Sequence, residues 1–186
     1  QRINFQTKPL VEFRLAVATR HQTFHSQHSM AATQSPLRPG QRVLLLLDAN
    51  CDPERRAALA GEISRAVGAE LAADAVCSMN DQAALAALPS ATFDVVLSFA
   101  NDAAAHSSAL LSSVVMRVLR PDGVLLLRER VGAQPPLRDT RALFGQLTLS
   151  GFVGASSSVY DQQQVIVEMC ARKPAWSAGA SQGLRR

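Results

Sequence analysis

The stretch RVLRPDGVLLLRERV, Arg117–Val131, decides the fold class of this chain. Its first residues are typical of the end of a helix. Pro121 and Gly123 predict a tight, type I-like turn after that helix. The uninterrupted aliphatic run that follows predicts a strand over Val124–Val131 that is covered on both faces, as in a parallel sheet. We expect its polar end, Arg128–Arg130, to be a solvated strand end, with a partner contact as the alternative.

Two other stretches predict central strands of the same kind, VLLLLD at Val43–Asp48 and FDVVLSF at Phe93–Phe99. A helix between them has clear end signals. Asp52 is a good N-cap, Pro53 suits the first helical position, and Gly68 suits the C-terminal end. Residues at i, i+4 and i+8 predict its buried stripe: Leu59, Ile63 and Val67.

Weaker signals complete the predicted order of elements. They predict a strand within Ala69–Cys77, a short helix capped by Asn80 or Asp81, a helix capped by Asn101 or Asp102, a helix over Asp139–Ser150, and closing strands near Phe152–Tyr160 and Gln164–Arg172. Strands that alternate with helices indicate parallel βαβ units. The predicted fold class is α/β, with a mainly parallel, doubly wound sheet and a terminal antiparallel strand pair.

The composition indicates a folded domain whose basic charge lies in its tails. Of 186 residues, 47% are hydrophobic and 18% are charged, which suits a real core. The net charge is +4, yet residues 30–171 hold 11 basic and 14 acidic residues. The body therefore offers no basic surface for nucleic acid. No apolar run approaches the roughly 20 residues that span a bilayer, so we expect no membrane association.

We expect three regions along the chain. Residues 1–35 predict a disordered or non-native tail, resembling a transit peptide or translated upstream sequence, with Met30 as the expected natural initiator. Within it, His21, His25 and His28 have a helical spacing that could hold a metal, although a solvated tail is our interpretation. Residues 36–173 form the folded domain, and residues 174–186 begin a flexible linker.

Three cysteines, Cys51, Cys77 and Cys170, are too far apart to suggest a disulfide framework, and their number is odd. This pattern favours a reducing compartment. We expect each to be a small buried apolar side chain. Cys51 lies next to a helix start, where a thiolate is favoured. No base lies beside it in the sequence, so we assign it no catalytic role.

The order of elements, with FDVVLSF before a helix and VLRPDGVLLL after it, resembles class I methyltransferases that bind S-adenosylmethionine (SAM). That fold binds ligands beyond the carboxyl ends of its strands, and its first loop is normally glycine-rich. Asp48 fits the pattern, but the loop reads DANCDPE and has no glycine. Side chains of Asn50, Cys51 and Pro53 occupy the cofactor's approach. The loop therefore predicts that SAM does not bind.

The remaining candidate site residues are few. A second acid should end the second strand to hold the ribose, and the nearest candidates are Glu70 and Asp74, neither of which clearly ends a strand. His106 and Asp102 form a conceivable acid–base pair, although a solvent contact at a helix start is our interpretation. The sequence has no G-x-S-x-G, no P-loop and no H-E-x-x-H motif. We therefore predict no catalytic, cofactor-binding or metal-binding residues.

A narrower resemblance comes from LFGQLTLSGFVGASSSVY, residues 143–160, and VIVEMCARKPAWSAGAS, residues 165–181. A helix that ends in LTLSGF, followed by a strand pair that ends in Lys-Pro and an aromatic residue, resembles the N-terminal domain of the anamorsin family. LPSATFDVVLSF and LLSSVVMRVLRPDGVLLLRE stand in the matching order. The resemblance covers roughly residues 40–180.

This resemblance implies a role in cytosolic iron–sulfur cluster assembly. Family members join a methyltransferase-like domain without cofactor-binding residues, through a flexible linker, to a cysteine-rich domain. That domain binds iron–sulfur clusters and receives electrons from a diflavin reductase. The three cysteines of this chain match no cluster motif, so the chain is either a fragment that ends in the linker, which its tail favours, or a relative without the redox half. We expect no cofactor here and clusters only in a C-terminal region that this sequence lacks.

The resemblance also implies partners and a location. The expected partners are the diflavin reductase and iron–sulfur assembly proteins, and the expected location is the cytoplasm, with the mitochondrial intermembrane space as a second site. The predicted function is thus a non-catalytic interaction domain. Two alternatives stay open, an active SAM-dependent methyltransferase with an atypical cofactor loop and a domain that only dimerises.

Overall fold

The structure is a computed structural model. It describes residues 37–71, 75–100, 105–132, 137, 139–161 and 166–175. Several predictions lie outside these residues: those for the N-terminal tail with its histidines, for Asp74, for Asn101 and Asp102, and for the chain from Trp176 onward.

The described residues form a six-stranded sheet in the order β2-β1-β3-β4-β6-β5. The strands are β1 Val43–Leu47, β2 Val76–Ser78, β3 Phe93–Phe99, β4 Leu119–Arg130, β5 Val153–Asp161 and β6 Ile166–Arg172. The first four are mutually parallel, whereas β6 runs antiparallel to both β4 and β5. The predicted fold class is confirmed, and so is the central position of β1, β3 and β4.

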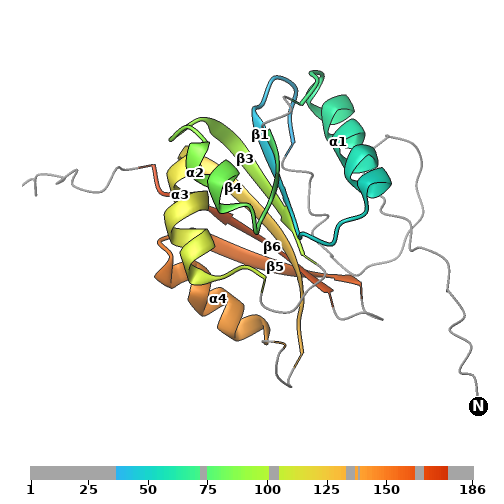
Figure 1. Cartoon of the computed structure of the whole chain (residues 1–186). Coiled ribbons are helices and arrows are strands. Elements are labelled where there is room, and N and C mark those ends of the chain that lie inside the picture. Colours follow the sequence, from blue (N-terminus) through green and yellow to red (C-terminus); the bar gives the residue numbers. More distant parts are fainter. Residues whose placement is uncertain are drawn as a thin grey trace, which may run out of the picture. The chain divides into compact units, whose positions relative to one another are not determined.

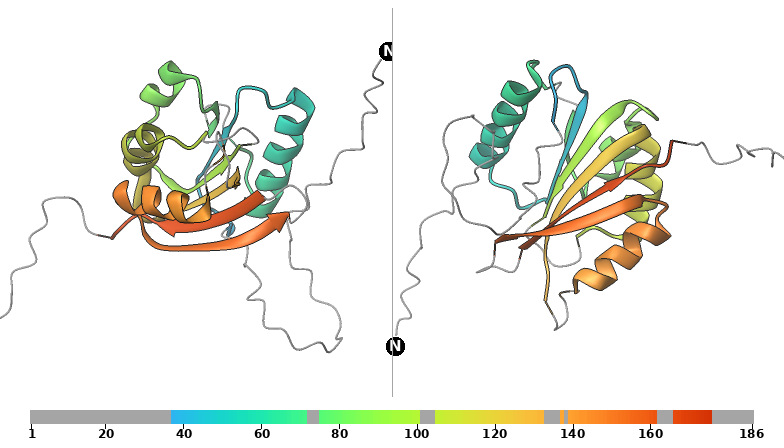
Figure 2. Two further views of the ribbon diagram at one scale, coloured as in Figure 1. Left: turned by 90° about the horizontal axis from the view of Figure 1, so that it is seen from below. Right: turned by 180° about the vertical axis from the view of Figure 1, so that it is seen from behind.

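Helices cover the two faces of this sheet unequally. The helical segments are α1 Pro53–Val67, α2 Gln82–Ala87, η2 Leu110–Val115 continuing into α3 Met116–Val118, and α4 Thr140–Leu149. Figures 1 and 2 show α2, α3 and α4 on one face and α1 on the other. Among the described residues, no helix is long and apolar enough to cross a membrane.

Helix α1 begins and ends where its local signals predict. The Asp52 carboxylate accepts hydrogen bonds from the N–H groups of Glu54 and Arg55, and Pro53 occupies the first turn. Gly68 ends the helix with φ of 70°, a left-handed conformation that glycine adopts without strain. The predicted stripe of Leu59, Ile63 and Val67 is buried against the sheet.

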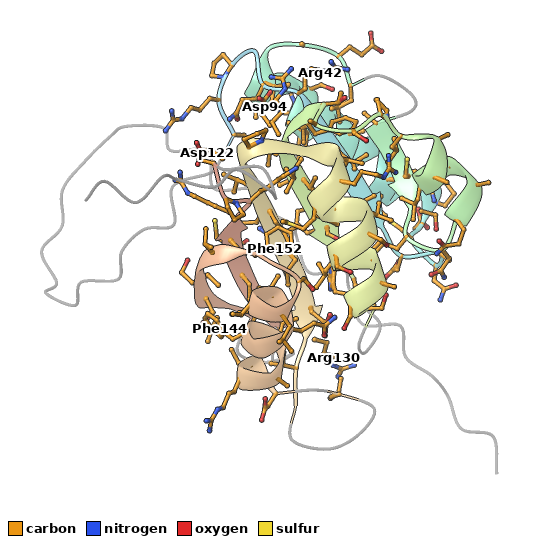
Figure 3. The ribbon with its side chains drawn as sticks, turned by 90° about the vertical axis from the view of Figure 1, so that its left-hand side faces the viewer. Arg42, Asp94, Asp122, Arg130, Phe144 and Phe152 are labelled. Carbon is orange, nitrogen blue, oxygen red and sulfur yellow. The ribbon has the colours of Figure 1, made fainter. Side chains whose placement is uncertain are left out.

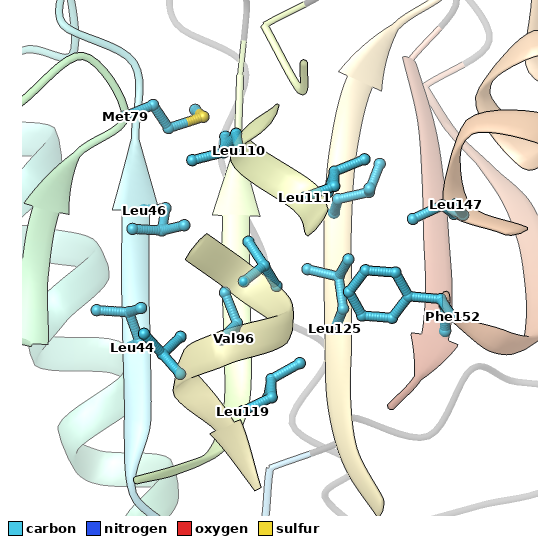
Figure 4. Packing of buried hydrophobic residues seen from close by; sticks show 14 of the residues in the cluster. Leu44, Leu46, Met79, Val96, Leu110, Leu111, Leu119, Leu125, Leu147 and Phe152 are labelled. Atoms are coloured by element: carbon cyan, nitrogen blue, oxygen red, sulfur yellow. The ribbon is translucent and has the colours of Figure 1, made fainter. Parts of the chain in front are cut away.

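The main core fills the space between the sheet and the helices α2, α3 and α4. Figure 4 shows Leu44, Leu46, Val96 and Leu125 from three neighbouring strands packed against Leu111 and the other helical side chains. Full burial of each large aliphatic side chain favours folding by roughly 1.5–3 kcal/mol. This core makes the sheet a rigid support for the loops at its two edges.

The segment around the Pro-Asp-Gly turn differs from the prediction in two ways. Strand β4 starts before the turn, because Leu119 pairs with Phe93 and Val124 pairs with Val95, so residues 120–123 bulge out of the ladder. Asp122 has φ of 62°, which belongs to a type II-like turn, so the predicted type I-like turn is wrong. A Cβ on Gly123 would lie 2.8 Å from the Arg120 carbonyl oxygen, so the turn requires glycine.

The helix that precedes this turn starts later than predicted. Ser107 caps it, since the Leu110 N–H donates to the Ser107 hydroxyl at 3.1 Å and the Leu111 N–H donates to the Ser107 carbonyl. Serine is a strong N-cap residue because its oxygen satisfies an amide that has no partner within the helix. The predicted caps Asn101 and Asp102 lie outside the described residues.

Candidate functional site

Ligands of open α/β sheets bind beyond the carboxyl ends of the parallel strands, which we call the carboxyl edge. At the end of β1, Asp48 is buried, and the loop after it is a tight turn in which the Cys51 N–H donates to the Asp48 carbonyl at 3.2 Å. The first free amides of α1 are already bound by Asp52, at 2.7 and 3.3 Å. The anion-binding end of this helix is thus occupied by the chain's own carboxylate.

The end of β2 carries a methionine where a ribose-binding acid was expected. Met79 is buried, and its N–H donates to the Leu47 carbonyl at 2.8 Å. The next acid, Asp81, caps α2 by accepting from the Ala84 N–H at 2.9 Å. The candidate Glu70 is exposed and precedes β2, so it does not reach this edge from the end of a strand.

A buried hydrogen-bond network lies at the ends of β3 and β4. His106 Nδ1 lies 2.6 Å from Glu129 Oε2, and His106 Nε2 lies 2.8 Å from Ser98 Oγ. All three residues are 0% exposed. The expected solvent contact of His106 is therefore wrong, and its carboxylate partner is Glu129, whereas Asp102 lies outside the described residues. We call Ser98, His106, Glu129 and Gln146 the His106 network.

The backbone of His106 is held as firmly as its ring. Its N–H donates to Glu129 Oε2 at 3.3 Å, and its carbonyl accepts from Gln146 Nε2 on α4. The network thereby joins β3, β4, α4 and the segment that enters the η2 helix. Polar groups in so dry a site stabilise the fold only because they are paired with one another.

The same three groups, a serine, a histidine and a carboxylate linked in this order, form the catalytic triads of hydrolases. A neutral ring with a proton on Nδ1 would donate to Glu129 and accept from the Ser98 hydroxyl. A protonated ring would donate to both, and the hydroxyl would then turn to Met79 Sδ, 3.6 Å away. Both arrangements satisfy the ring, but full burial keeps the Ser98 oxygen from any substrate. The geometry supports a structural network rather than a nucleophile.

The other charged residues of β4 also correct the sequence-based expectation. Arg128 is buried, binds Glu168 on β6 at 2.7 Å, and places its guanidinium 4.8 Å from the Phe99 ring centroid. Of the predicted solvated cluster, only Arg130 is exposed. The pairing follows from the register, since Arg128 lies directly opposite Glu168 in the antiparallel ladder.

The surroundings of Cys51 and Cys170 do not favour their thiolates. Cys77 is buried as predicted, but Cys51 and Cys170 are only half-buried. Burial, followed by the neighbouring Asp48 carboxylate, raises the pKa of Cys51, so the thiolate that its helix position suggested is not favoured. Burial likewise raises the pKa of Cys170. Within the described ranges, no three His, Cys, Asp or Glu residues come together as a metal site.

The opposite end of the sheet, the amino edge, has a more open polar cluster. Asp94 accepts from the Arg42 N–H and from Arg120 Nη1, each at 2.8 Å. Figure 3 shows Arg42 and Asp94 at this edge and Arg130 at the other. The Asp94 and Arg120 side chains stay 27% and 44% exposed.

Sequence reasoning missed the His106 network and the Arg128–Glu168 pair. The available signal was a polar residue within an otherwise apolar strand, Ser98 in FDVVLSF and Glu129 after VLLL. Both face the same side of the sheet, because Ser98 pairs with Leu127, two residues before Glu129. Such residues need buried partners, and His106 is the histidine that the body of the sequence offers.

Comparison with solved structures agrees with this architecture. The fold is similar to phosphoethanolamine N-methyltransferase 2 of Haemonchus contortus in complex with S-adenosyl-L-methionine, with a TM-score of 0.53, 13% identity, and coverage of 75% of this chain and 50% of that one. It is also similar to a possible exported protein from Bordetella parapertussis, with a TM-score of 0.51, 17% identity, and coverage of 75% and 63%. At such identities the similarity shows a methyltransferase-like fold alone.

Sequence comparison reaches further. Residues 40–181 match the family model described as "Anamorsin, N-terminal". A curated relative from Nematostella vectensis, an anamorsin homolog, is 34% identical over 144 residues, which are 76% of this chain and 49% of the relative. The chain thus spans about half the length of that relative. With the family model covering most of its length and a methyltransferase-like fold in place, this chain belongs to the anamorsin family.

Proposed function

We propose that this chain is a non-catalytic, methyltransferase-like interaction domain of an anamorsin-type protein that acts in cytosolic iron–sulfur cluster assembly. The observation that carries the proposal is the state of the carboxyl edge. Three features at the place where this fold binds a cofactor support the proposal: Asp52 on the α1 amides, buried Met79 after β2, and the His106 network at the ends of β3 and β4.

Each of these features argues against one part of a cofactor site. A cofactor carboxylate would have to displace Asp52 from the N–H groups that it caps. A ribose would meet a thioether where two hydroxyl groups need an acid. A methyl acceptor that must lose a proton would need access to a base, but His106 and Glu129 are fully buried.

The redox part of the proposal rests on the family. The cysteines lie on separate elements, Cys51 before α1, Cys77 in β2 and Cys170 in β6. A four-iron cluster typically uses four thiolates. We therefore propose that clusters are held by a cysteine-rich C-terminal region of the full-length protein. In this proposal, a diflavin reductase and assembly proteins are the partners, and the cytoplasm and mitochondrial intermembrane space are the locations.

Titration calorimetry with SAM tests the non-catalytic part. We expect no saturable heat up to millimolar ligand, for this chain and for an Asp48→Asn variant alike. A micromolar dissociation constant that the Asp48 substitution weakens would instead support the alternative, an active SAM-dependent methyltransferase with an atypical cofactor loop.

Deletion in the full-length protein tests the assembly role. Cluster content and electron transfer from the reductase should fall when residues 40–170 are removed, because the domain then no longer presents the cluster region to its partners. Absorbance of reconstituted cluster and the rate of its reduction give the two readouts. Equal yields and equal rates with and without the domain would contradict the proposed role.

A further inference from the structure

Lys173, the residue after β6, binds one short stretch of the chain, residues 116–123, that lies far from it in the sequence. Its Nζ donates to the carbonyl oxygens of Met116 at 2.7 Å and Leu119 at 2.6 Å. Its backbone N–H donates to the Gly123 carbonyl at 2.9 Å. One residue therefore binds the end of the η2–α3 helix and the turn that follows it.

The two side-chain acceptors are carbonyls that a helix end leaves without partners. The helix stops at Val118, and Pro121 lies just beyond it. Carbonyls in the last turn carry the negative end of the helix dipole, so a lysine ammonium is well placed there. Burial lowers the pKa of Lys173, and the two short hydrogen bonds offset that cost of removing its charge from water.

The backbone acceptor belongs to a rigid turn. Gly123 closes residues 120–123, and Asp122 holds a left-handed φ of 62° within it. This turn is also held at the amino edge, since Arg120 Nη1 donates to Asp94 at 2.8 Å. Beyond Lys173, Pro174 is buried, and its ring fixes its own φ.

From these contacts we infer that Lys173 and Pro174 form an anchor that fixes where the C-terminal part of the chain leaves the domain. Val124 pairs with Arg172, so this exit lies at the amino edge, opposite the carboxyl edge. The Arg-Pro-Asp-Gly turn thus has a structural role in this domain that does not involve a cofactor. It supplies the Gly123 carbonyl that accepts from the N–H of Lys173, one residue past β6.

The functional consequence of the anchor, unlike the anchor itself, rests on the proposed function. A tethered group reaches a partner at an effective concentration set by the span between the tether's origin and its target. If the tether starts at a fixed point beside Asp94 and the turn, that span is defined for a C-terminal cluster region. If the end of β6 frays, the starting point of the tether varies and the span is not defined.

The test uses this chain alone, so its failure is separable from failure of the iron–sulfur proposal. Trp176 is the single tryptophan of the sequence and lies three residues beyond Lys173. We compare Lys173→Met, which keeps the apolar stem but removes the donors, with the matched control Arg172→Met at an exposed neighbouring site. The readouts are time-resolved anisotropy of Trp176 and hydrogen exchange of individual amides.

We expect Lys173→Met to speed exchange of the Lys173 amide by about tenfold or more, as loss of charged hydrogen bonds implies. The fast component of the Trp176 anisotropy should grow, while β3 and β4 core amides keep their rates. Arg172→Met should leave both readouts unchanged. Unchanged readouts in Lys173→Met, or equally faster exchange across the whole sheet, would overturn the anchor.

A measurement on the unsubstituted chain keeps the inference testable if Lys173→Met does not fold. The Lys173 amide should exchange about a hundredfold more slowly than in an unstructured peptide, because opening its bond requires local unfolding. Exchange at the free-peptide rate would show that the chain leaves the sheet before Lys173 and would overturn the anchor on its own.

Discussion

The two edges of the sheet are both held by a carboxylate, but the surroundings of the two carboxylates differ. At each edge one carboxylate joins elements far apart in sequence, Glu129 at the carboxyl edge and Asp94 at the amino edge. Glu129 and its partner His106 are wholly buried, whereas the Asp94 and Arg120 side chains remain 27% and 44% exposed. The carboxylate at the carboxyl edge is therefore bound in the interior, and the one at the amino edge is bound where solvent reaches it.

This difference indicates what each edge does for the domain. A buried pair is costly to break because the remaining partner is left without water, while a solvated pair can exchange its partner for water. The buried pair of His106 and Glu129 at the carboxyl edge is therefore harder to break than the solvated pair at the amino edge. The amino edge keeps its polar groups accessible, and the anchor at Lys173 lies there.

The largest expected effect comes from Glu129→Gln. It removes the buried charge that binds both the His106 ring and its backbone N–H. We expect the free energy of unfolding to fall by about 3 kcal/mol, the lower end of the cost of breaking a buried pair, because the amide keeps an acceptor. Urea unfolding followed by circular dichroism measures it. If Glu129→Gln lowered the free energy of unfolding by less than the matched Asp94→Asn substitution does, the buried carboxylate would not be the more costly one to lose.

A smaller effect is expected from Ser98→Ala. The hydroxyl lies 2.8 Å from His106 Nε2, and its loss leaves that nitrogen buried without this partner. We expect a loss of about 2 kcal/mol, the cost of an unsatisfied buried polar group. In a double-mutant cycle with Glu129→Gln, the two losses should not add, because both act through one imidazole. Strict additivity would argue against a connected network.

The contrast between the edges also explains what the sequence could predict. The caps of α1, Asp52 and Gly68, act within a few residues, and the apolar runs of the central strands state their burial directly. Both kinds of signal are local, and both predictions are confirmed. His106 and Glu129 are 23 residues apart, and only the packing of the segment before η2 against β4 brings them together.

The Pro-Asp-Gly turn shows the same limit within one short stretch. Its position follows from Pro121 and Gly123, but its type depends on Asp122 adopting a positive φ. That conformation is set by the bulge in the ladder between β3 and β4, since residues 120–123 must leave and rejoin a parallel pairing. The sequence therefore predicts that the chain turns here, while the pairing of the strands decides how.

At the amino edge, Asp94→Asn should cost at most about 1 kcal/mol, because Asp94 and Arg120 are partly solvated and screened. Raising the salt concentration should reduce the difference between this variant and the unsubstituted chain. The same salt series should leave the Glu129→Gln difference nearly unchanged, since a buried pair is little screened. A salt response of equal size at the two edges would remove the distinction drawn between them.

The smallest expected effect concerns Cys51, in the turn that follows β1 at the carboxyl edge. Burial and the Asp48 carboxylate raise the pKa of its thiol, so alkylation by iodoacetamide at pH 8 should be slower than that of a cysteine in an unstructured peptide. Asp48→Asn removes the second cause and should speed the reaction a few-fold, as measured by mass spectrometry of the Cys51 peptide.

Because the pKa of the Cys51 thiol is higher in the folded state than in the unfolded state, the neutral thiol's contribution to stability is complete below about pH 9 and is lost as the pH rises beyond it. Alkylation at the free-peptide rate, unaffected by Asp48→Asn, would show that the loop around Cys51 is open to solvent, although the His106 network at the same edge is buried.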